Sequence, residues 1–231
     1  MDKFYLENHS HKKILRKFLQ LNSLKLQRTK SSLKQRQGIF YNYCRYYSIL
    51  ITPLYPVLFL PNVLQAFLNT TPPRTVSTAP KKIALSFDYK RRAYRQYDIL
   101  ALYFMGSTGT IAYSDKSDFD IWVCHREDLS AIELKELQLK TERISQWCTE
   151  FNLEANFFLI HTEQFRAGKI ENLSSESSGT SQHLFLLEEF YRTSMLLEGR
   201  YPIWWLVPEF EQVYDEYVEN IMISTTFEDS F

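Results

Sequence analysis

Apolar and polar residues alternate in the middle of the chain in patterns that predict strands. The apolar run Ile99 to Met105 ends at a glycine, which is typical of a buried strand followed by a tight turn. Further on, acidic and apolar residues alternate with period 2, so Asp118 and Asp120 share one face of a strand. Phe119 and Ile121 share the other face. The sequence therefore predicts a strand with one face for burial and one for chemistry.

A helix and a third strand are predicted next. Ser130 and Glu133 form a capping-box sequence, which marks the start of a helix. One apolar face then recurs at helical spacing and comprises Leu137, Ile144, Trp147, Cys148 and Phe151. The segment Leu153 to Ile160 is aromatic and apolar and favours a strand. The order of strand, turn, strand, helix and strand predicts an α/β or α+β sheet with helices packed on one side.

A second helix is predicted beyond a serine-rich loop. Thr180 is placed to cap it. Its core positions are expected at Leu184, Leu187, Tyr191, Met195 and Leu197.

The N-terminal part has a different composition. Residues 1–40 are rich in lysine and arginine, whereas the chain after Arg200 carries only acidic charges. The apolar stretch 49–68 is interrupted by prolines, which argues against a transmembrane segment, and a linker rich in Thr, Pro and Ser follows over 69–80. We predict a basic, mainly helical N-terminal lobe with its linker over 1–80 and a catalytic domain over 81–231.

Composition agrees with a soluble cytoplasmic enzyme. The 231 residues are 45% hydrophobic and 16% aromatic, which is enough for a sizeable core. The formal net charge of zero argues against a stable nucleic-acid partner. Cys44, Cys124 and Cys148 show no disulfide or zinc spacing. The basic first helix is expected to be a solvated face, and a peripheral membrane or regulatory-protein contact stays open.

The paired aspartates suit a divalent metal ion. Mg²⁺ takes hard oxygen ligands and keeps several waters, so Asp118 and Asp120 suffice to hold it. Such an ion supports phosphoryl or nucleotidyl transfer. Gly106 allows the chain to turn close to a phosphate, and Ser107 would open a short helix that attracts anions. Two aspartates at this spacing are also common in solvated loops, so the prediction depends on the glycine, the serine and both strands together.

The same residues carry a resemblance to known proteins. The run Met105-Gly106-Ser107-Thr108, a short gap and then Ser117 to His125 resemble the nucleotidyltransferase superfamily typified by DNA polymerase beta. More narrowly, they are similar to the class I adenylate cyclases of gamma-proteobacteria, whose signature reads M-G-S-T and then S-D-L-D-I-W-V-C-H. Phe119 replaces the leucine. Segments 157–160, 179–183 and 188–193 match in the same order, and the resemblance covers about residues 100 to 218.

This resemblance implies a polymerase-beta-like mixed sheet with helices packed on it and a cyclase reaction. ATP would be converted to 3′,5′-cyclic AMP and pyrophosphate with two Mg²⁺ ions, or with Mn²⁺ in their place, held by Asp118 and Asp120. The phosphates would lie against Gly106, Ser107 and Thr108. Arg192 and His183 would lie near the nucleotide.

Glu154 is the candidate for a further carboxylate. Members of the superfamily usually have a third acid on a neighbouring strand, and Glu154 is the only acid in the segment 153–160. It would be a third metal ligand or the base near the ribose hydroxyl. It is also compatible with a simple cap of the strand in solvent.

The roles of two helix residues, and the reaction itself, stay open. Arg192 is placed to pair with Glu188 or Glu189 within its own helix, and His183 is as compatible with a helix surface as with catalysis. Another nucleotidyltransferase, transferring AMP to a protein, a small molecule or a nucleic-acid end, would share the same motif. Because the resembling proteins carry a large C-terminal regulatory part, the sequence is also compatible with a fragment that binds nucleotide without turnover.

Overall fold

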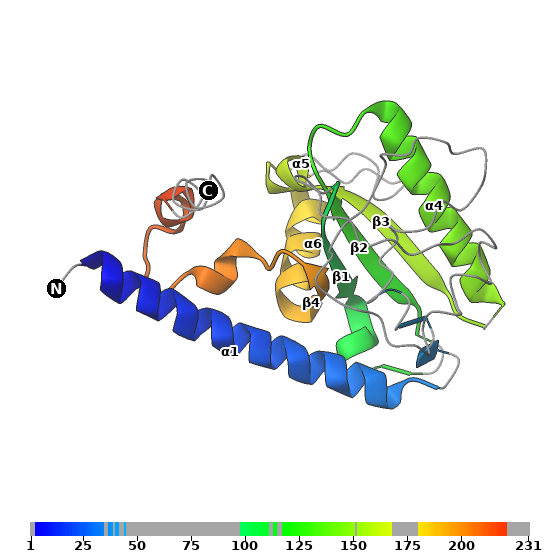
Figure 1. Cartoon of the computed structure of the whole chain (residues 1–231), viewed down its shortest axis with the longest axis horizontal. Coiled ribbons are helices and arrows are strands. Elements are labelled where there is room, and N and C mark those ends of the chain that lie inside the picture. Colours follow the sequence, from blue (N-terminus) through cyan, green and yellow to red (C-terminus); the bar gives the residue numbers. More distant parts are fainter. Residues whose placement is uncertain are drawn as a thin grey trace, which may run out of the picture. The chain divides into compact units, whose positions relative to one another are not determined.

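The computed structural model describes residues 3–34, 37–38, 40–41, 44, 98–110, 113–114, 117–150, 152–167 and 180–220. These residues include one mixed four-stranded sheet in the order β3-β2-β1-β4 (Figure 1). Its strands are β1 (Ile99–Met105), β2 (Phe119–His125), β3 (Ala155–His161) and β4 (Met195–Gly199). β1 is antiparallel to β2 and β4, whereas β2 is parallel to β3. The predicted mixed sheet is confirmed.

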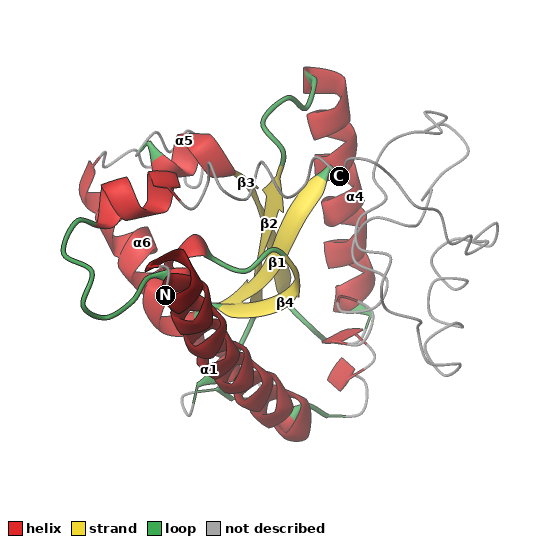
Figure 2. Ribbon diagram, turned by 60° about the vertical axis from the view of Figure 1, so that its left-hand side comes forward, coloured by secondary structure: helices red, strands yellow, loops and turns green. Residues whose placement is uncertain are grey.

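Helices cover both faces of this sheet. The helical elements are α1 (Lys3–Ser32), η2 (Gly106–Gly109), α4 (Ala131–Thr149), α5 (Thr162–Arg166), α6 (Thr180–Thr193) and η3 (Ile203–Leu206), and a further helix spans 214–220. α4 and α6 lie on opposite sides of the strands (Figure 2). This differs from the expected packing on one side, because β1 and β2 carry large aromatic or apolar side chains at positions of both parities.

The face of the sheet that meets α4 forms the main core. Leu102 and Phe104 of β1 and Phe119 and Ile121 of β2 are fully buried there. From α4 the core receives Leu137, Ile144, Trp147 and Cys148, as the helical spacing predicts. Phe151 lies outside the described residues. The capping box of Ser130 and Glu133 at the start of α4 is also confirmed.

An aromatic cluster joins α6 to the opposite face. Trp122 of β2 stacks on Phe190 of α6, with ring centroids 5.4 Å apart and an interplanar angle of 14°. Tyr103 meets the edge of Phe190 at 5.1 Å, and Phe165 of α5 meets Trp122 at 5.2 Å. Because aromatic pairs favour these stacked and edge arrangements, the cluster holds α6 in place on the sheet.

The expected core positions of α6 were partly wrong. Leu184 and Tyr191 are exposed, at 59% and 44% of their surface. Met195 and Leu197 are buried in the core, but they belong to strand β4 and not to the helix. α6 ends at Thr193 and β4 begins at Met195, so the helical spacing cannot be extended to these two residues. Phe190, which the spacing did not single out as a core residue, makes the main contact with the sheet.

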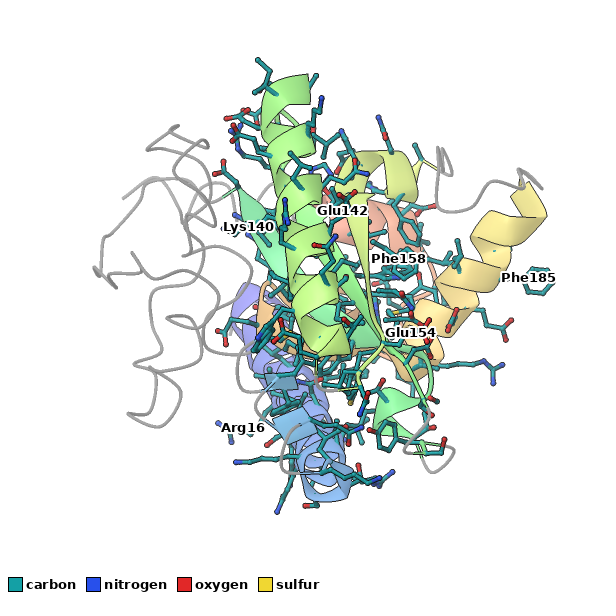
Figure 3. All side chains as sticks on the ribbon, turned by 90° about the vertical axis from the view of Figure 1, so that its right-hand side faces the viewer. Arg16, Lys140, Glu142, Glu154, Phe158 and Phe185 are labelled. Atoms are coloured by element: carbon teal, nitrogen blue, oxygen red, sulfur yellow. The ribbon has the colours of Figure 1, made fainter. Side chains whose placement is uncertain are left out.

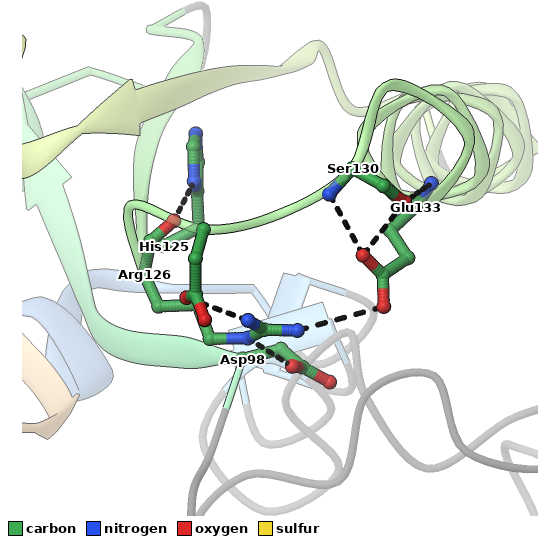
Figure 4. A network of polar contacts seen from close by, with 6 residues as sticks. Asp98, His125, Arg126, Ser130 and Glu133 are labelled. Carbon is green, nitrogen blue, oxygen red and sulfur yellow. Dashed lines mark hydrogen bonds and ion pairs between the residues drawn. The ribbon is translucent and has the colours of Figure 1, made fainter.

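A polar network fixes the other end of β2. Arg126 forms ion pairs with Asp98 (2.6 Å), with Asp128 (2.5 Å) and, at 3.5 Å, with Glu133 of the capping box (Figure 4). The backbone carbonyl of Arg126 lies 2.8 Å from Nδ1 of His125. The start of β1, the end of β2 and the first turn of α4 are therefore tied together.

The described chain groups into two compact units, residues 1–24 with 201–231 and residues 25–200. In the first unit, Phe18 stacks on Trp205 with centroids 5.4 Å apart. The second unit holds the whole sheet, and there the Thr29 hydroxyl donates to the Thr108 carbonyl at 3.1 Å. The division at residue 80 stays a prediction.

The expectations for the apolar stretch 49–68 and for the linker 69–80 fall outside the described residues. Within the part of the chain that is described, none of the helices combines the length and the apolar character needed to cross a bilayer.

Candidate active site

The two aspartates stand at the start of β2 on the face that meets α6. Asp118 is exposed and directly precedes the strand, and Asp120 is half-buried within it. The fully buried Phe119 between them points into the core. The side-chain amide of Asn156 donates to Asp118 Oδ2 at 3.3 Å and to Asp120 Oδ1 at 3.1 Å. One amide thus holds both carboxylates together, because Asn156 is paired with Asp120 in the parallel register of β2 and β3.

A glycine turn lies directly beside Asp120. The antiparallel register pairs Met105 with Asp120, so Gly106 follows at the same edge of the site. Gly106 has φ of +68°, a conformation that L side chains rarely adopt. A Cβ atom at this position would lie 3.6 Å from Asp120 Oδ2 and 3.9 Å from Glu189 Oε1. The absence of a side chain therefore leaves space between two carboxylates.

The end of α6 is bonded to this turn. The Gly106 N–H donates to Thr193 Oγ1 at 3.1 Å, and the Thr193 hydroxyl donates to the carbonyl of Glu189 at 2.9 Å. Thr193 therefore bonds the glycine turn to the last turn of α6 and fixes the helical residues that face the aspartates.

The electrostatics of the site show concentrated negative charge. Partial burial raises the pKa of Asp120, the hydrogen bond from Asn156 opposes this shift, and the charges of Asp118 and Glu154 add to it. Partial burial, followed by the charge of Asp120, raises the pKa of Glu189. A cation placed among these groups would relieve the repulsion.

The remaining residues proposed from the sequence are placed as follows. Glu154 is exposed just before β3, close enough for its charge to act on Asp120 (Figure 3). Ser107 lies in η2, where its carbonyl accepts from the Thr110 N–H at 2.9 Å. Thr108 is buried, and in the part of the chain that is described its hydroxyl has no hydrogen-bond partner.

Arg192 and His183 both belong to α6, as expected. Arg192 Nη2 lies 2.5 Å from Glu188 Oε1, and both side chains are largely exposed. An ion pair within the helix is thus present in the structure. The side chain of His183 is outside the described part of the chain. Among the described residues, no three His, Cys, Asp or Glu side chains are grouped closely enough to hold a metal ion as they stand.

Sequence reasoning missed the contribution of Glu189, Phe190 and Thr193. All three lie in the segment 188–193, where Arg192 was singled out and Glu189 was considered only as an ion-pair partner for it. Glu189 and Thr193 are four residues apart and therefore share a helix face, whereas Glu188 and Arg192 share a neighbouring one. This helical spacing would have separated the face that carries Glu189 and Thr193 from the face that carries the Glu188–Arg192 ion pair, although Glu189 is itself exposed.

Fold and site together define an α/β protein with an acidic, glycine-flanked centre on one face of a mixed sheet. Residues 10–205 match the family described as the adenylate cyclase NT domain. The chain belongs to this family.

Curated relatives share the central part of the sequence. The adenylate cyclase of Pasteurella multocida is 42% identical over 127 residues, covering 54% of this chain and 15% of the relative. The adenylate cyclase of Proteus mirabilis is 44% identical over 124 residues, covering 53% and 14%. That of Salmonella typhi is 41% identical over 124 residues, covering 53% and 15%. The matched region is thus a small part of each relative.

Two solved structures show a weak likeness. One is a toxin–antitoxin crystal structure with AMP-PNP, with 17% identity and a TM-score of 0.27 over 58% of this chain and 79% of that chain. The other, a mutant of the toxin–antitoxin MntA-HpeT, has 16% identity and a TM-score of 0.26 over 57% and 77%. Likeness at this level supports no conclusion about the site.

Proposed function

We propose that the chain carries the catalytic site of an adenylate cyclase, which converts ATP to 3′,5′-cyclic AMP and pyrophosphate. The observation that supports this most strongly is the family match over residues 10–205. It coincides with the placement of Asp118 and Asp120 beside Gly106 on one face of the sheet. The named relatives are adenylate cyclases, and the region they share with this chain is about 15% of their length.

The residues of the site fit a divalent cation. Carboxylate oxygens of Asp118 and Asp120 are hard donors of the kind that Mg²⁺ prefers, and Mn²⁺ accepts the same set. The position where a Cβ of Gly106 would stand leaves room beside Asp120. When bound, such ions supply charge neutralisation at the phosphates and lower the pKa of an attacking hydroxyl. We assign Asp118 and Asp120 as the residues that would hold them.

The remaining groups are proposed to position the nucleotide. Because the Gly106 N–H is occupied by Thr193, the donors for the phosphates would be Ser107 and the backbone N–H groups after it. The ribose 3′-hydroxyl would attack the α-phosphate of the same molecule and release pyrophosphate. Glu154 is exposed near Asp120 and is a candidate to accept the hydroxyl proton. Arg192 would reach the triphosphate after leaving Glu188. His183 remains proposed near the nucleotide.

Product analysis tests the proposal. Purified chain is incubated with ATP and Mg²⁺ beside an Asp118→Ala, Asp120→Ala double variant, and the products are separated by chromatography. We expect cyclic AMP and pyrophosphate from the unaltered chain alone. Covalent transfer of AMP to an acceptor would instead favour another nucleotidyltransferase. ATP binding without any product would contradict turnover by this chain.

A further inference from the structure

Glu189 is the acidic residue of α6 that faces the paired aspartates. A Cβ built on Gly106 would lie 3.9 Å from Glu189 Oε1 and 3.6 Å from Asp120 Oδ2. The two oxygens are therefore no further apart than the sum of these distances. They come from different elements, α6 and β2, with the side-chain-free glycine between them.

The neighbouring Glu188 provides a contrast on the same helix. Glu188 is paired with Arg192 at 2.5 Å on an exposed face. Among the described residues, the carboxylate of Glu189 has neither a hydrogen bond nor an ion pair, and the nearby charge of Asp120 is repulsive. The protein thus neutralises one of two adjacent glutamates and leaves the other facing a like charge.

The neighbouring strand does not place an acid directly beside Asp120. In the register of β2 and β3, the residue opposite Asp120 is Asn156, which donates to both aspartates. Glu154 stands before the strand begins and is exposed. The strand position directly opposite Asp120 is therefore occupied by an amide, while α6 brings Glu189 close to Asp120 across Gly106.

We propose that Glu189 supplies the third carboxylate of the metal site, in place of an acid on β3. Because the described carboxylates do not form a three-ligand group as they stand, Glu189 would join the site through a bound water or after its side chain turns toward Asp120. This inference rests on the proposed function. Mg²⁺ binds oxygen directly at about 2.1 Å and commonly keeps waters, so one ion can connect two carboxylates directly or through a bound water. Thr193 is the positioning residue, because its bonds to Gly106 and to the carbonyl of Glu189 fix this part of α6.

Metal binding without turnover is the direct test. Mn²⁺ is titrated into the full chain, without nucleotide, and the free ion is counted by electron paramagnetic resonance. Glu189→Gln keeps the shape of the side chain and removes its charge, and we expect it to weaken Mn²⁺ binding at least ~10-fold. Glu188→Gln is the matched control on the same helix and Glu154→Gln the competing candidate. Both are expected to stay within about twofold of the unaltered chain.

Further readouts separate ligand loss from damage to the fold. Circular dichroism and Tm of Glu189→Gln should match those of Glu188→Gln, and Glu189→Asp should recover part of the affinity. In the cyclase assay, the Glu189→Gln variant should need more Mn²⁺ for half-maximal rate.

Two results would overturn the inference. Mn²⁺ affinity that is unchanged in Glu189→Gln, or lost in Glu154→Gln instead, would return the third position to the strand. The Asp118→Ala, Asp120→Ala variant keeps the two proposals distinguishable. If it binds Mn²⁺ as well as the unaltered chain, or if the unaltered chain binds none, the metal site of the proposed function fails together with this inference.

Discussion

The two faces of the sheet differ in what they bury. Toward α4, Phe104, Phe119 and Ile121 pack into a fully apolar core. Toward α6, Asp120 and Trp122 alternate with these residues along the same strand, and carboxylates lie beside an aromatic cluster. Because successive side chains of a strand point to opposite faces, one seven-residue strand serves both purposes.

This difference separates residues that stabilise the fold from residues proposed for chemistry, although they are neighbours in sequence. The α4 face gains stability from burial of apolar area. The α6 face carries like charges at close range, which opposes folding in the absence of a cation. Substitutions at adjacent positions of β2 should therefore affect either turnover or stability, depending on the face to which the side chain points.

The largest effect is expected for Asp120→Ala on the α6 face. Loss of a carboxylate that is proposed to hold the metal should lower turnover at least ~10³-fold, which corresponds to about 4 kcal/mol in the activation barrier. The fold should be retained, because removal of Asp120 also removes its repulsion with Asp118. Cyclic AMP formation and circular dichroism measured on the same sample check both statements. Near-normal turnover would contradict the assignment.

Ile121→Ala, one residue further on, should lower the stability of the fold and leave turnover unchanged. Ile121 is fully buried in the core, so its truncation should cost about 2–5 kcal/mol in the free energy of unfolding. Urea denaturation followed by fluorescence measures this loss. The protein that remains folded should keep its turnover per molecule. A loss below about 0.5 kcal/mol, which is typical of surface positions, would show that this face is not the packed core.

Gly106→Ala should reduce both stability and metal binding, each by less than the two substitutions above. Its positive φ makes a side chain costly by about 1–2 kcal/mol, and the new Cβ would stand between Asp120 and Glu189. We expect weaker Mn²⁺ binding in addition to the stability loss. Ser107→Ala is the control next to it. Unchanged metal affinity in Gly106→Ala would show that this space is not used.

Lys140 makes the stability of α4 dependent on pH. Burial lowers the pKa of Lys140 from 10.5 to about 7. Between these values the native lysine is largely neutral while the unfolded one holds its proton, so stability rises with pH across this range and is lowest below pH 7. Lys140→Met should therefore stabilise the protein, on the order of 1 kcal/mol, more at pH 6 than at pH 10. An equal gain at both values, measured by urea denaturation, would contradict a buried charge.

The smallest effect is expected at the start of α4. Ser130 accepts from the Glu133 N–H, and Glu133 in return accepts from the Ser130 N–H at 2.8 Å. Ser130→Ala should cost about 1 kcal/mol in stability without a change in turnover. Thermal unfolding followed by circular dichroism gives the shift in Tm. A larger drop in turnover than in stability would connect this helix end to the site.

Much of the fold could be predicted because local patterns determine it. The strand Ile99–Met105, the capping box at Ser130 and the buried face of α4 were all predicted from spacing alone. Strand order and helix sides could not be predicted in this way, because they depend on pairing between distant segments. Met195 and Leu197 were assigned to the preceding helix, although their separation of two residues fits a strand, and they belong to β4.

The placement of the candidate site residues was predictable where one strand carries them. Asp118 and Asp120 could be assigned to one face of β2 from their period, and Gly106 could be placed nearby through the turn. Glu189 and Thr193 could not, because their approach depends on how α6 is held by Trp122 and Phe190. A single sequence does not specify such a contact between distant elements.

Anomalous diffraction from crystals grown with Mn²⁺ and a non-hydrolysable ATP analogue would locate the metal ions and the nucleotide in one experiment. We expect manganese peaks on the α6 face, in contact with Asp118 and Asp120, with the triphosphate beside Ser107. Manganese away from these aspartates, or nucleotide bound on the α4 side of the sheet, would contradict the proposed site.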